Sequence, residues 1–231
     1  MAIAALVGLW LFRRELNRAE LPQNAIDAAF VGIFAGLLGA KLWWTVEFFG
    51  TAPFFSLLLS RGGLSWFGGF TFGLCGGLLV IRLKRLPLLA ILSAAGPALA
   101  IGHAIGRIGC FLVGDDYGKV SDLPWAVAFP EGLPPTLQRV HPTQIYEALP
   151  LFLIGGLLLQ LRRNRASDRT VFATYLLLAG GTRFLIEFIR VNDHVLGPLT
   201  IAHIASLVAM SAGAYLAYRA TGASRRMFSR R

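Results

Sequence analysis

Long blocks of apolar residues constrain this chain more than any other feature of its sequence. About 20 helical residues cross the roughly 30 Å of hydrocarbon in a bilayer, and six blocks come close to or exceed that length. They are approximately 26–49, 64–81, 88–106, 145–161, 171–189 and 196–218. A shorter apolar segment, 1–12, has no basic region before it and no small-residue cleavage site after it, which favours a first helix over a signal peptide. The sequence therefore predicts an all-α integral membrane protein with about seven transmembrane helices.

The basic residues predict the orientation of these helices. The formal net charge is +10, but a nucleic-acid-binding protein gathers such charge on one face. Here most Lys and Arg residues fall in clusters that follow every second apolar block. The clusters are Arg13, Arg14 and Arg18; Arg82, Lys84 and Arg85; Arg162, Arg163, Arg165 and Arg169; and Arg219, Arg225, Arg226, Arg230 and Arg231. Because cytoplasmic connections carry excess Lys and Arg, we expect an external N-terminus, a cytoplasmic C-terminus and no nucleic-acid partner.

The connection 113–143 is the longest stretch that is not apolar, and we expect it to form a periplasmic loop or head region. A loop of this length is usually functional or disordered. The alternation of apolar residues in PWAVAF, 124–129, predicts a short strand or an interfacial hairpin within it. The other connections are short, so the chain is predicted to be a single transmembrane helical domain over 1–231.

Two cysteines, Cys75 and Cys110, lie in or beside apolar blocks and are expected to be buried thiols. They do not form the C-x2-C spacing of a metal site. We therefore expect neither a metal nor another cofactor.

Several ionisable residues lie inside the apolar blocks, where a charge costs a few kcal/mol and usually faces a cavity or a partner. Arg183 and Glu187 are four residues apart and share a helix face, which Arg190 extends. His103 and Arg107 have the same spacing. The plainer alternatives are an ion pair within one helix for Arg183, snorkelling to the interface for Arg107, and a packed bundle histidine for His103.

A polar segment, HPTQIYE at 141–147, lies where the long loop enters the next apolar block. Pro142 suits a first helical turn, and the polar residues after it would face the outer side of the membrane. Arginine presents a planar fork that matches a phosphate group. Arginines accompanied by Asp115, Glu147 and Glu187 therefore predict a membrane protein that binds an anionic lipid headgroup from the outside.

Three segments in this order resemble the prolipoprotein diacylglyceryl transferases of bacterial inner membranes. They are GRIGCFLVGDDYG at 106–118, HPTQIYE at 141–147 and GTRFLIEFIR at 181–190. The resemblance covers about residues 8–215. It implies a multi-pass inner-membrane enzyme that transfers the diacylglyceryl group of phosphatidylglycerol to the lipobox cysteine thiol of a prolipoprotein, whose signal peptide it binds. Glycerol phosphate leaves in this reaction.

The resemblance also implies roles for individual residues. Arg107 corresponds to the phosphate-binding arginine, Arg183 to a second essential arginine, and Glu187 to its partner on the helix. The positions expected to bind substrate, either by match to the family's motifs or by their place beside these residues, are His141, Gln144, Tyr146, Glu147, Gly118, Asp115 and Arg190.

The chain departs from the family at several polar positions. Phe67 stands where the family has a histidine that is a leading candidate base, Cys110 replaces an asparagine, Ala179 replaces a tyrosine, and His203 replaces a glutamine. We hypothesise that His103, one turn before Arg107, takes over as the base for the thiol. Two alternatives stay open: a related enzyme with a different acceptor, and a non-catalytic anionic-lipid-binding protein or transporter.

Overall fold

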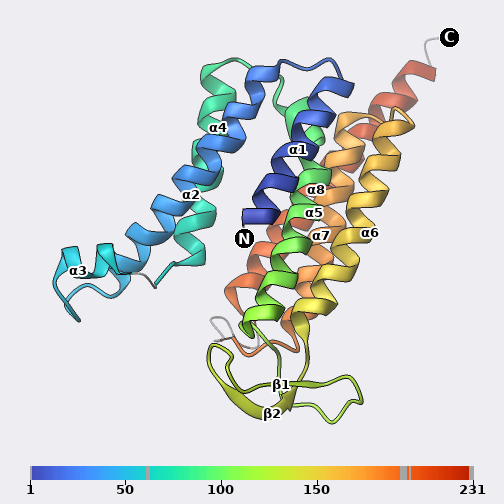
Figure 1. Cartoon of the computed structure of the whole chain (residues 1–231). Coiled ribbons are helices and arrows are strands. Elements are labelled where there is room, and N and C mark those ends of the chain that lie inside the picture. Colours follow the sequence, from blue (N-terminus) through green and yellow to red (C-terminus); the bar gives the residue numbers. More distant parts are fainter. Residues whose placement is uncertain (1, 61–62, 193–196, 198, 229–231) are drawn as a thin grey trace. The chain divides into compact units, whose positions relative to one another are not determined.

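The computed structural model describes residues 2–60, 63–192, 197 and 199–228 (Figure 1). Within these residues a helix forms in each of the seven segments where the sequence predicts one. The helices are α1 (Ala2–Arg18), α2 (Ile26–Glu47), α4 (Trp66–Leu83), α5 (Leu88–Val113), α6 (Thr143–Arg163), α7 (Asp168–Glu187) and α8 (Ile201–Phe228). Two short helices, η1 (Gln23–Ala25) and α3 (Phe54–Leu59), flank α2.

Four of the described helices are long and apolar enough to cross a membrane. They are Gln23–Glu47, Leu88–Val113, Thr143–Arg163 and Ile201–Thr221, and α4 is apolar but shorter over Phe67–Leu83. Large apolar side chains such as Phe34, Leu38 and Val208 are exposed on these helices, as a lipid environment requires. The structure fits an all-helical integral membrane protein.

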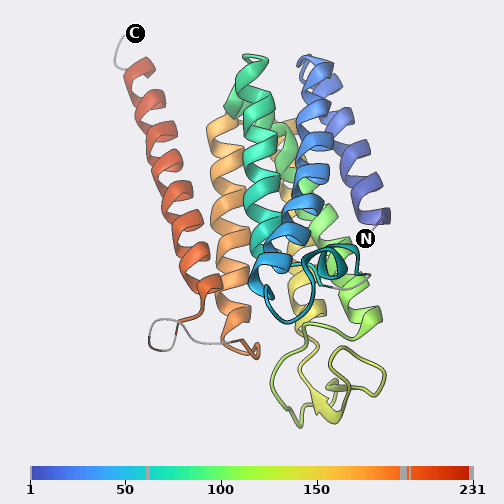
Figure 2. The same cartoon turned by 90° about the vertical axis from the view of Figure 1, so that its left-hand side faces the viewer.

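The chain divides into two compact units, Arg13–Ile91 on the one hand and Met1–Phe12 with Leu92–Arg231 on the other. In the first unit α2 packs along α4 (Figure 2). A Cβ atom at Gly68 would lie 2.2 Å from the Gly39 carbonyl oxygen, and one at Gly36 would lie 3.0 Å from that of Gly69. Glycine at these positions lets the two backbones approach closely, as small residues do in membrane helix pairs.

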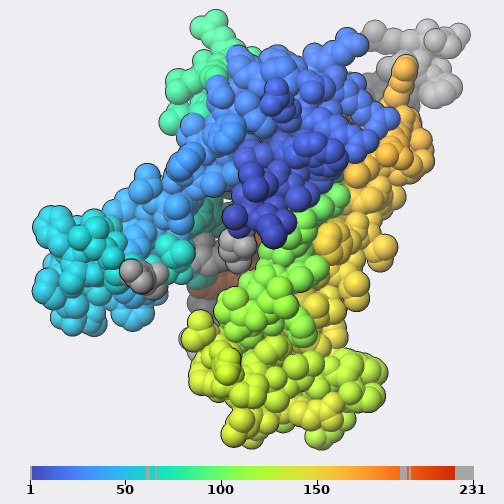
Figure 3. Space-filling model, in the orientation of Figure 1, coloured from blue at the N-terminus to red at the C-terminus, as the bar shows by residue number. Residues whose placement is uncertain are grey.

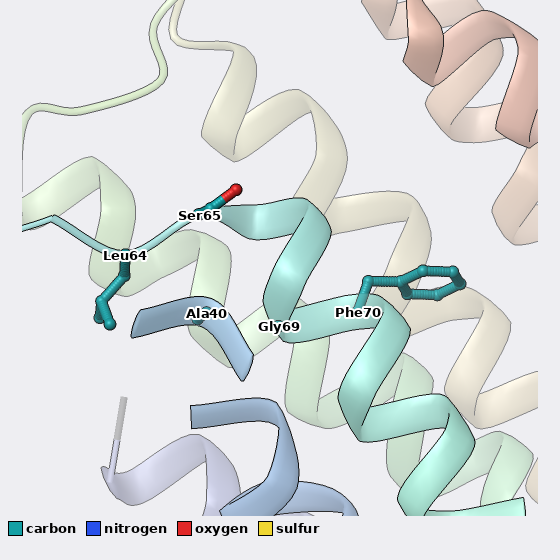
Figure 4. A pocket seen from close by; sticks show the side chains of 5 residues that line it. All are labelled: Ala40, Leu64, Ser65, Gly69 and Phe70. Atoms are coloured by element: carbon teal, nitrogen blue, oxygen red, sulfur yellow. The ribbon is translucent and has the colours of Figure 1, made fainter. Parts of the chain in front are cut away.

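The first unit also corrects the prediction for Cys75, which is exposed rather than buried. Gly73, Gly76 and Gly77 face α2, and helical periodicity turns the residue between them away from that contact. The same unit holds a pocket of about 440 Å³ lined by Ala40, Leu64, Ser65, Gly69 and Phe70 (Figure 4). None of these side chains is charged.

The second unit is a bundle in which α5, α6 and α7 share one apolar core. The core consists of Ala100, Ala104, Leu151, Ile154, Leu158 and Val171, with Ala179 partly buried against it. A Cβ atom at Gly155 of α6 would lie 2.4 Å from the Ile101 side chain of α5, so this glycine permits their close packing. Ser167 caps α7 by accepting the Thr170 N–H at 3.1 Å.

The head region between α5 and α6 contains the predicted hairpin. β1 (Val127–Phe129) pairs antiparallel with β2 (Thr136–Val140), which confirms the expectation from the alternating sequence. Figure 3 shows these residues, in yellow-green, as a continuous surface at the end of α5 and α6. Helix α5 runs to Val113, about two turns past its predicted end. Arg107 therefore lies inside the helix and not at its end.

Candidate functional site

Charged side chains from three helices meet where the bundle joins the head region. α5 contributes Arg107, α6 contributes Glu147, and α7 contributes Arg183 and Glu187, all of which were candidates from the sequence. The loops after α5 and α7 add Asp116 and Arg190. The cluster thus alternates three guanidinium groups with three carboxylates, and all six belong to the second compact unit.

Glu147 lies at the centre of this cluster. Its side chain is 1% exposed, and its Oε2 lies 2.9 Å from Nε of Arg107 and 3.4 Å from Nη1 of Arg183. A buried carboxylate is tolerated only when it is paired in this way. Glu147 therefore ties α5, α6 and α7 together at one point.

Glu187 pairs with the second and third arginines. Its Oε2 lies 2.8 Å from Nη2 of Arg183 and 3.7 Å from Nε of Arg190. Its Oε1 accepts hydrogen bonds from Asn192 and from the Thr200 hydroxyl, both at 2.7 Å. The ion pair within α7 does form, as the plainer alternative proposed, but it is one link in a network that crosses several elements.

Asp116 is a site residue that was missed in the sequence. Its carboxylate accepts a hydrogen bond from Nη1 of Arg107 at 2.7 Å and from Nη2 of Arg190 at 2.6 Å. The residue has a φ of +61°, a conformation that Asp and Asn adopt more readily than other non-glycine residues. The spacing of residues in the sequence did not reveal that this turn brings the Asp116 side chain back to the arginines. The only signal was the pair of aspartates near the end of the segment GRIGCFLVGDDYG.

The two arginines control the ionisation of Asp116. Burial would raise the pKa of this carboxyl, but Arg190 and Arg107 outweigh burial and hold the pKa below its ordinary value. A lowered pKa means that these ion pairs stabilise the fold at pH above about 4, the ordinary Asp value. The stabilisation is lost as the pH falls through the lowered pKa.

His103 shares the face of α5 that carries Arg107, as their spacing predicts. Its Nε2 lies 3.5 Å from Oε1 of Glu147, and its side chain is 45% exposed. It therefore contacts the edge of the cluster while remaining open to an incoming group. This placement is compatible with proton transfer.

Two residues after Pro142 hold the loop that carries the aspartates. The Thr143 hydroxyl donates to the Asp116 carbonyl at 2.8 Å, and the Gln144 amide donates to the Asp115 carbonyl at 2.6 Å. Both side chains are fully buried. Gln144, expected to bind substrate, is thus engaged by the protein itself, and Asp115 contributes its backbone to the same contact.

Gly118 also helps to hold the loop that carries the two aspartates. Its N–H donates to the His141 carbonyl at 2.9 Å. A Cβ atom here would lie 2.7 Å from both the Ile189 carbonyl oxygen and the Thr143 methyl group. Glycine is needed because the loop, the start of α6 and the end of α7 converge at this point.

An aromatic group lies at the rim beside the head region. Trp125 donates its indole N–H to the Tyr146 hydroxyl at 2.5 Å, and Nδ1 of His141 lies 3.4 Å from the same hydroxyl. Trp125 is exposed. His141 and Tyr146 are therefore brought together with each other rather than with the arginines.

A second histidine, His203 of α8, is linked to Glu187 through Thr200. Its Nδ1 lies 3.2 Å from both the backbone nitrogen and the hydroxyl of Thr200, the residue that donates to Glu187. The ring packs against Phe184 and Phe188 at centroid distances of 5.0 and 4.5 Å. The sequence marked His203 as an ionisable residue inside the apolar block 196–218 and as a departure from the family, but it indicated no role for it.

The other departures have different surroundings. Cys110 is buried one turn after Arg107, and Phe67 lies on α4 in the first unit. Potential ligand atoms of Cys110, Asp115 and Asp116 lie within 4.8 Å of one another. Two arginines already bind Asp116, and their positive charge opposes a cation there. The guanidinium groups of Arg107 and Arg190 are instead suited to an anion with several oxygens, such as a phosphate group.

Comparison with known proteins agrees with this chemistry. The family model described as prolipoprotein diacylglyceryl transferase matches residues 1–219. A phosphatidylglycerol–prolipoprotein diacylglyceryl transferase from Methylobacillus flagellatus is 35% identical over 214 residues, which are 86% of this chain and 80% of that protein. The enzyme of that name from Geobacter sulfurreducens is 33% identical, over 82% of this chain and 75% of its own. The one from Clostridioides difficile is 28% identical, over 92% and 85%. With its arginine cluster and a match over nearly its whole length, the chain belongs to the prolipoprotein diacylglyceryl transferase family.

Proposed function

We propose that this protein transfers the diacylglyceryl group of phosphatidylglycerol to the lipobox cysteine thiol of prolipoproteins, whose signal peptide it binds. The observation that carries the proposal is the buried network in which Arg107, Arg183 and Arg190 meet around two glutamates. Three guanidinium groups gathered at the end of an apolar helix bundle match the phosphate of an anionic lipid. The family and the names of the relatives support the same reaction.

The arginines act on the leaving group in this reaction. The cysteine sulfur attacks the carbon of the diacylglyceryl group that is bonded to the phosphate oxygen. A carbon–sulfur bond forms there, and the bond from that carbon to oxygen breaks with its electron pair on the phosphate oxygen. Glycerol phosphate then leaves with an added negative charge. Guanidinium groups fixed where that charge develops stabilise the transition state.

The acceptor thiol must lose its proton because the thiolate is the nucleophile. His103 is the half-exposed basic side chain beside Arg107, and Glu147 can stabilise the imidazolium that forms. The guanidinium groups nearby favour the thiolate as well. His103 is therefore proposed as the group that accepts this proton.

The membrane arrangement is part of the proposal. We propose that residues 1–231 form a single transmembrane domain of seven spans in the bacterial inner membrane. The basic clusters between alternate apolar segments support an external N-terminus and a cytoplasmic C-terminus. The head region 113–143 then faces the periplasm, on the side where a secreted prolipoprotein presents its cysteine.

Transfer is testable with the purified protein. Incubation with phosphatidylglycerol and a lipobox peptide is expected to release glycerol phosphate and to add the mass of one diacylglyceryl group to the peptide, as read by mass spectrometry. A peptide with serine in place of the cysteine is the control and should remain unmodified. Release of glycerol phosphate without modification of the peptide would contradict the proposed acceptor.

Replacement of the proposed base should slow the reaction. His103→Ala is expected to lower kcat about 10²-fold, the usual contribution of a general base, with KM for phosphatidylglycerol nearly unchanged. The loss should shrink as the pH rises and the peptide thiol ionises on its own. His103→Gln, which keeps polarity without a titrating nitrogen, is expected to behave like the alanine variant. Full activity of both variants would remove His103 from the mechanism.

A further inference from the structure

Asp116 bridges two arginines in the way that a phosphate group would. One carboxylate oxygen binds Arg107 at 2.7 Å, and the other binds Arg190 at 2.6 Å. The two guanidinium groups come from elements distant in sequence, and each meets one oxygen. Two oxygens of a phosphodiester present the same charge-assisted contacts.

Asp116 is also the carboxylate of the cluster that is free to leave. Its side chain is 46% exposed, whereas those of Glu147 and Glu187 are 1% and 0% exposed. The two glutamates are anchored on helices, and removing either from its partners would strand a buried charge. The carboxylate of Asp116 lies in the loop after α5 and meets water when it turns outward.

The backbone around Asp116 does not need to move for this exchange. Thr143 holds the Asp116 carbonyl, Gln144 holds the Asp115 carbonyl, and the Gly114 carbonyl accepts the N–H of Leu133. Rotation of one side chain therefore releases both arginines from Asp116 while their contacts with Glu147 and Glu187 remain, and such rotations are fast compared with enzyme turnover.

Charge balance favours a single replacement. The Asp116 carboxylate carries one negative charge, and the other charged groups, including the neighbouring Asp115 carboxylate, are the same before and after the exchange. A phosphodiester also carries one negative charge. In addition, Nη1 of Arg190 is buried and has no hydrogen-bond partner among the described residues, so it can serve a further oxygen.

We propose that the Asp116 carboxylate is an internal competitor of the lipid phosphate for Arg107 and Arg190, and that it sets the affinity for the anionic lipid. The proposal rests on the proposed function for the identity of that lipid. The measured affinity then equals the intrinsic affinity reduced by the fraction of molecules in which Asp116 has released the arginines. If Asp116 holds them about nine-tenths of the time, its removal raises the apparent affinity about tenfold.

The test is the affinity of the full-length protein for phosphatidylglycerol in nanodiscs or mixed micelles. Asp116→Asn and Asp116→Ala are expected to lower Kd for phosphatidylglycerol about tenfold and to leave binding of neutral phosphatidylcholine unchanged. Asp122→Asn, a neutralised exposed aspartate in the same head region, is the matched control and should keep the native Kd. It separates a local effect from a general loss of negative charge.

The outcomes are distinct. Weaker or unchanged binding of phosphatidylglycerol in both Asp116 variants would overturn the proposal, because a purely structural Asp116 would misplace the arginines when removed. Equal tightening in Asp122→Asn would also overturn it. Because binding is measured without an acceptor, absence of peptide modification by the native protein would count against the proposed function alone.

Discussion

Arg107→Gln is expected to lower the rate of transfer to a lipobox peptide at least about 10²-fold while the protein remains folded. Arg107 contacts both Glu147 and Asp116, and in the proposed reaction it also meets the lipid phosphate. Loss of one donor that stabilises developing charge costs about 10²–10³ in kcat. Arg107 also contributes to binding, so kcat/KM is expected to fall further than kcat.

Stability should change much less than activity in this variant. Glu147 keeps Arg183 and Asp116 keeps Arg190, so neither carboxylate is stranded. The free energy of unfolding should therefore fall by less than the roughly 3–5 kcal/mol of a fully broken buried pair. The measurements are thermal unfolding in detergent and the transfer assay on the same preparation.

Two further variants sharpen the result. Arg107→Lys keeps the charge but not the planar fork, and it is expected to recover only part of the activity. Arg169→Gln removes an exposed arginine at the start of α7, outside the arginine cluster, and is expected to remain fully active. Native kcat/KM in Arg107→Gln would place the phosphate elsewhere.

The helices were predictable because their physical causes are local. Apolar composition and length indicated the approximate positions of α1, α2 and α4 to α8, but not of the short helix α3 in the connection after α2. Alternation in PWAVAF identified the hairpin strand. The end of α5 was placed too early because Arg107 reads as the end of an apolar run. In the structure Arg107 lies within the helix, which continues to Val113, and it pairs with Glu147 and Asp116. Glu147 is distant in the sequence and Asp116 is brought back by a turn, so neither contact was visible from the sequence.

The sequence named five of the six charged residues of the cluster, but neither Asp116 nor the contacts that join the six. Helical spacing correctly grouped Arg183 with Glu187 and His103 with Arg107. The contact of Glu147 with both groups depends on the packing of three helices, which spacing within one helix does not reveal. The position of Asp116 depends on a turn with positive φ. The polar residues form a network only through tertiary contacts of this kind, which the sequence does not reveal.

Glu147→Gln is expected to be the most destabilising single substitution in the cluster. The amide retains the shape of the carboxylate but not its charge, so Arg107 and Arg183 face each other across a buried neutral group. Removal of one partner from a buried network costs about 3–5 kcal/mol in the free energy of unfolding. In a chain of this size that corresponds to a thermal midpoint lower by about 10 °C. Transfer should fall as well, because Arg107 keeps only Asp116 and Arg183 keeps only Glu187 as the carboxylate that positions it.

A matched control and a double-mutant cycle identify the cause. Glu131→Gln neutralises an exposed glutamate of the head region and should leave the thermal midpoint unchanged. If Glu147 acts by holding Arg107, then Glu147→Gln combined with Arg107→Gln should destabilise by clearly less than the sum of the single changes. Additive effects would mean that the two residues stabilise the fold independently. An unchanged thermal midpoint in Glu147→Gln itself would contradict a central structural role for this carboxylate, since a group 1% exposed between two guanidinium groups has no solvent to replace them.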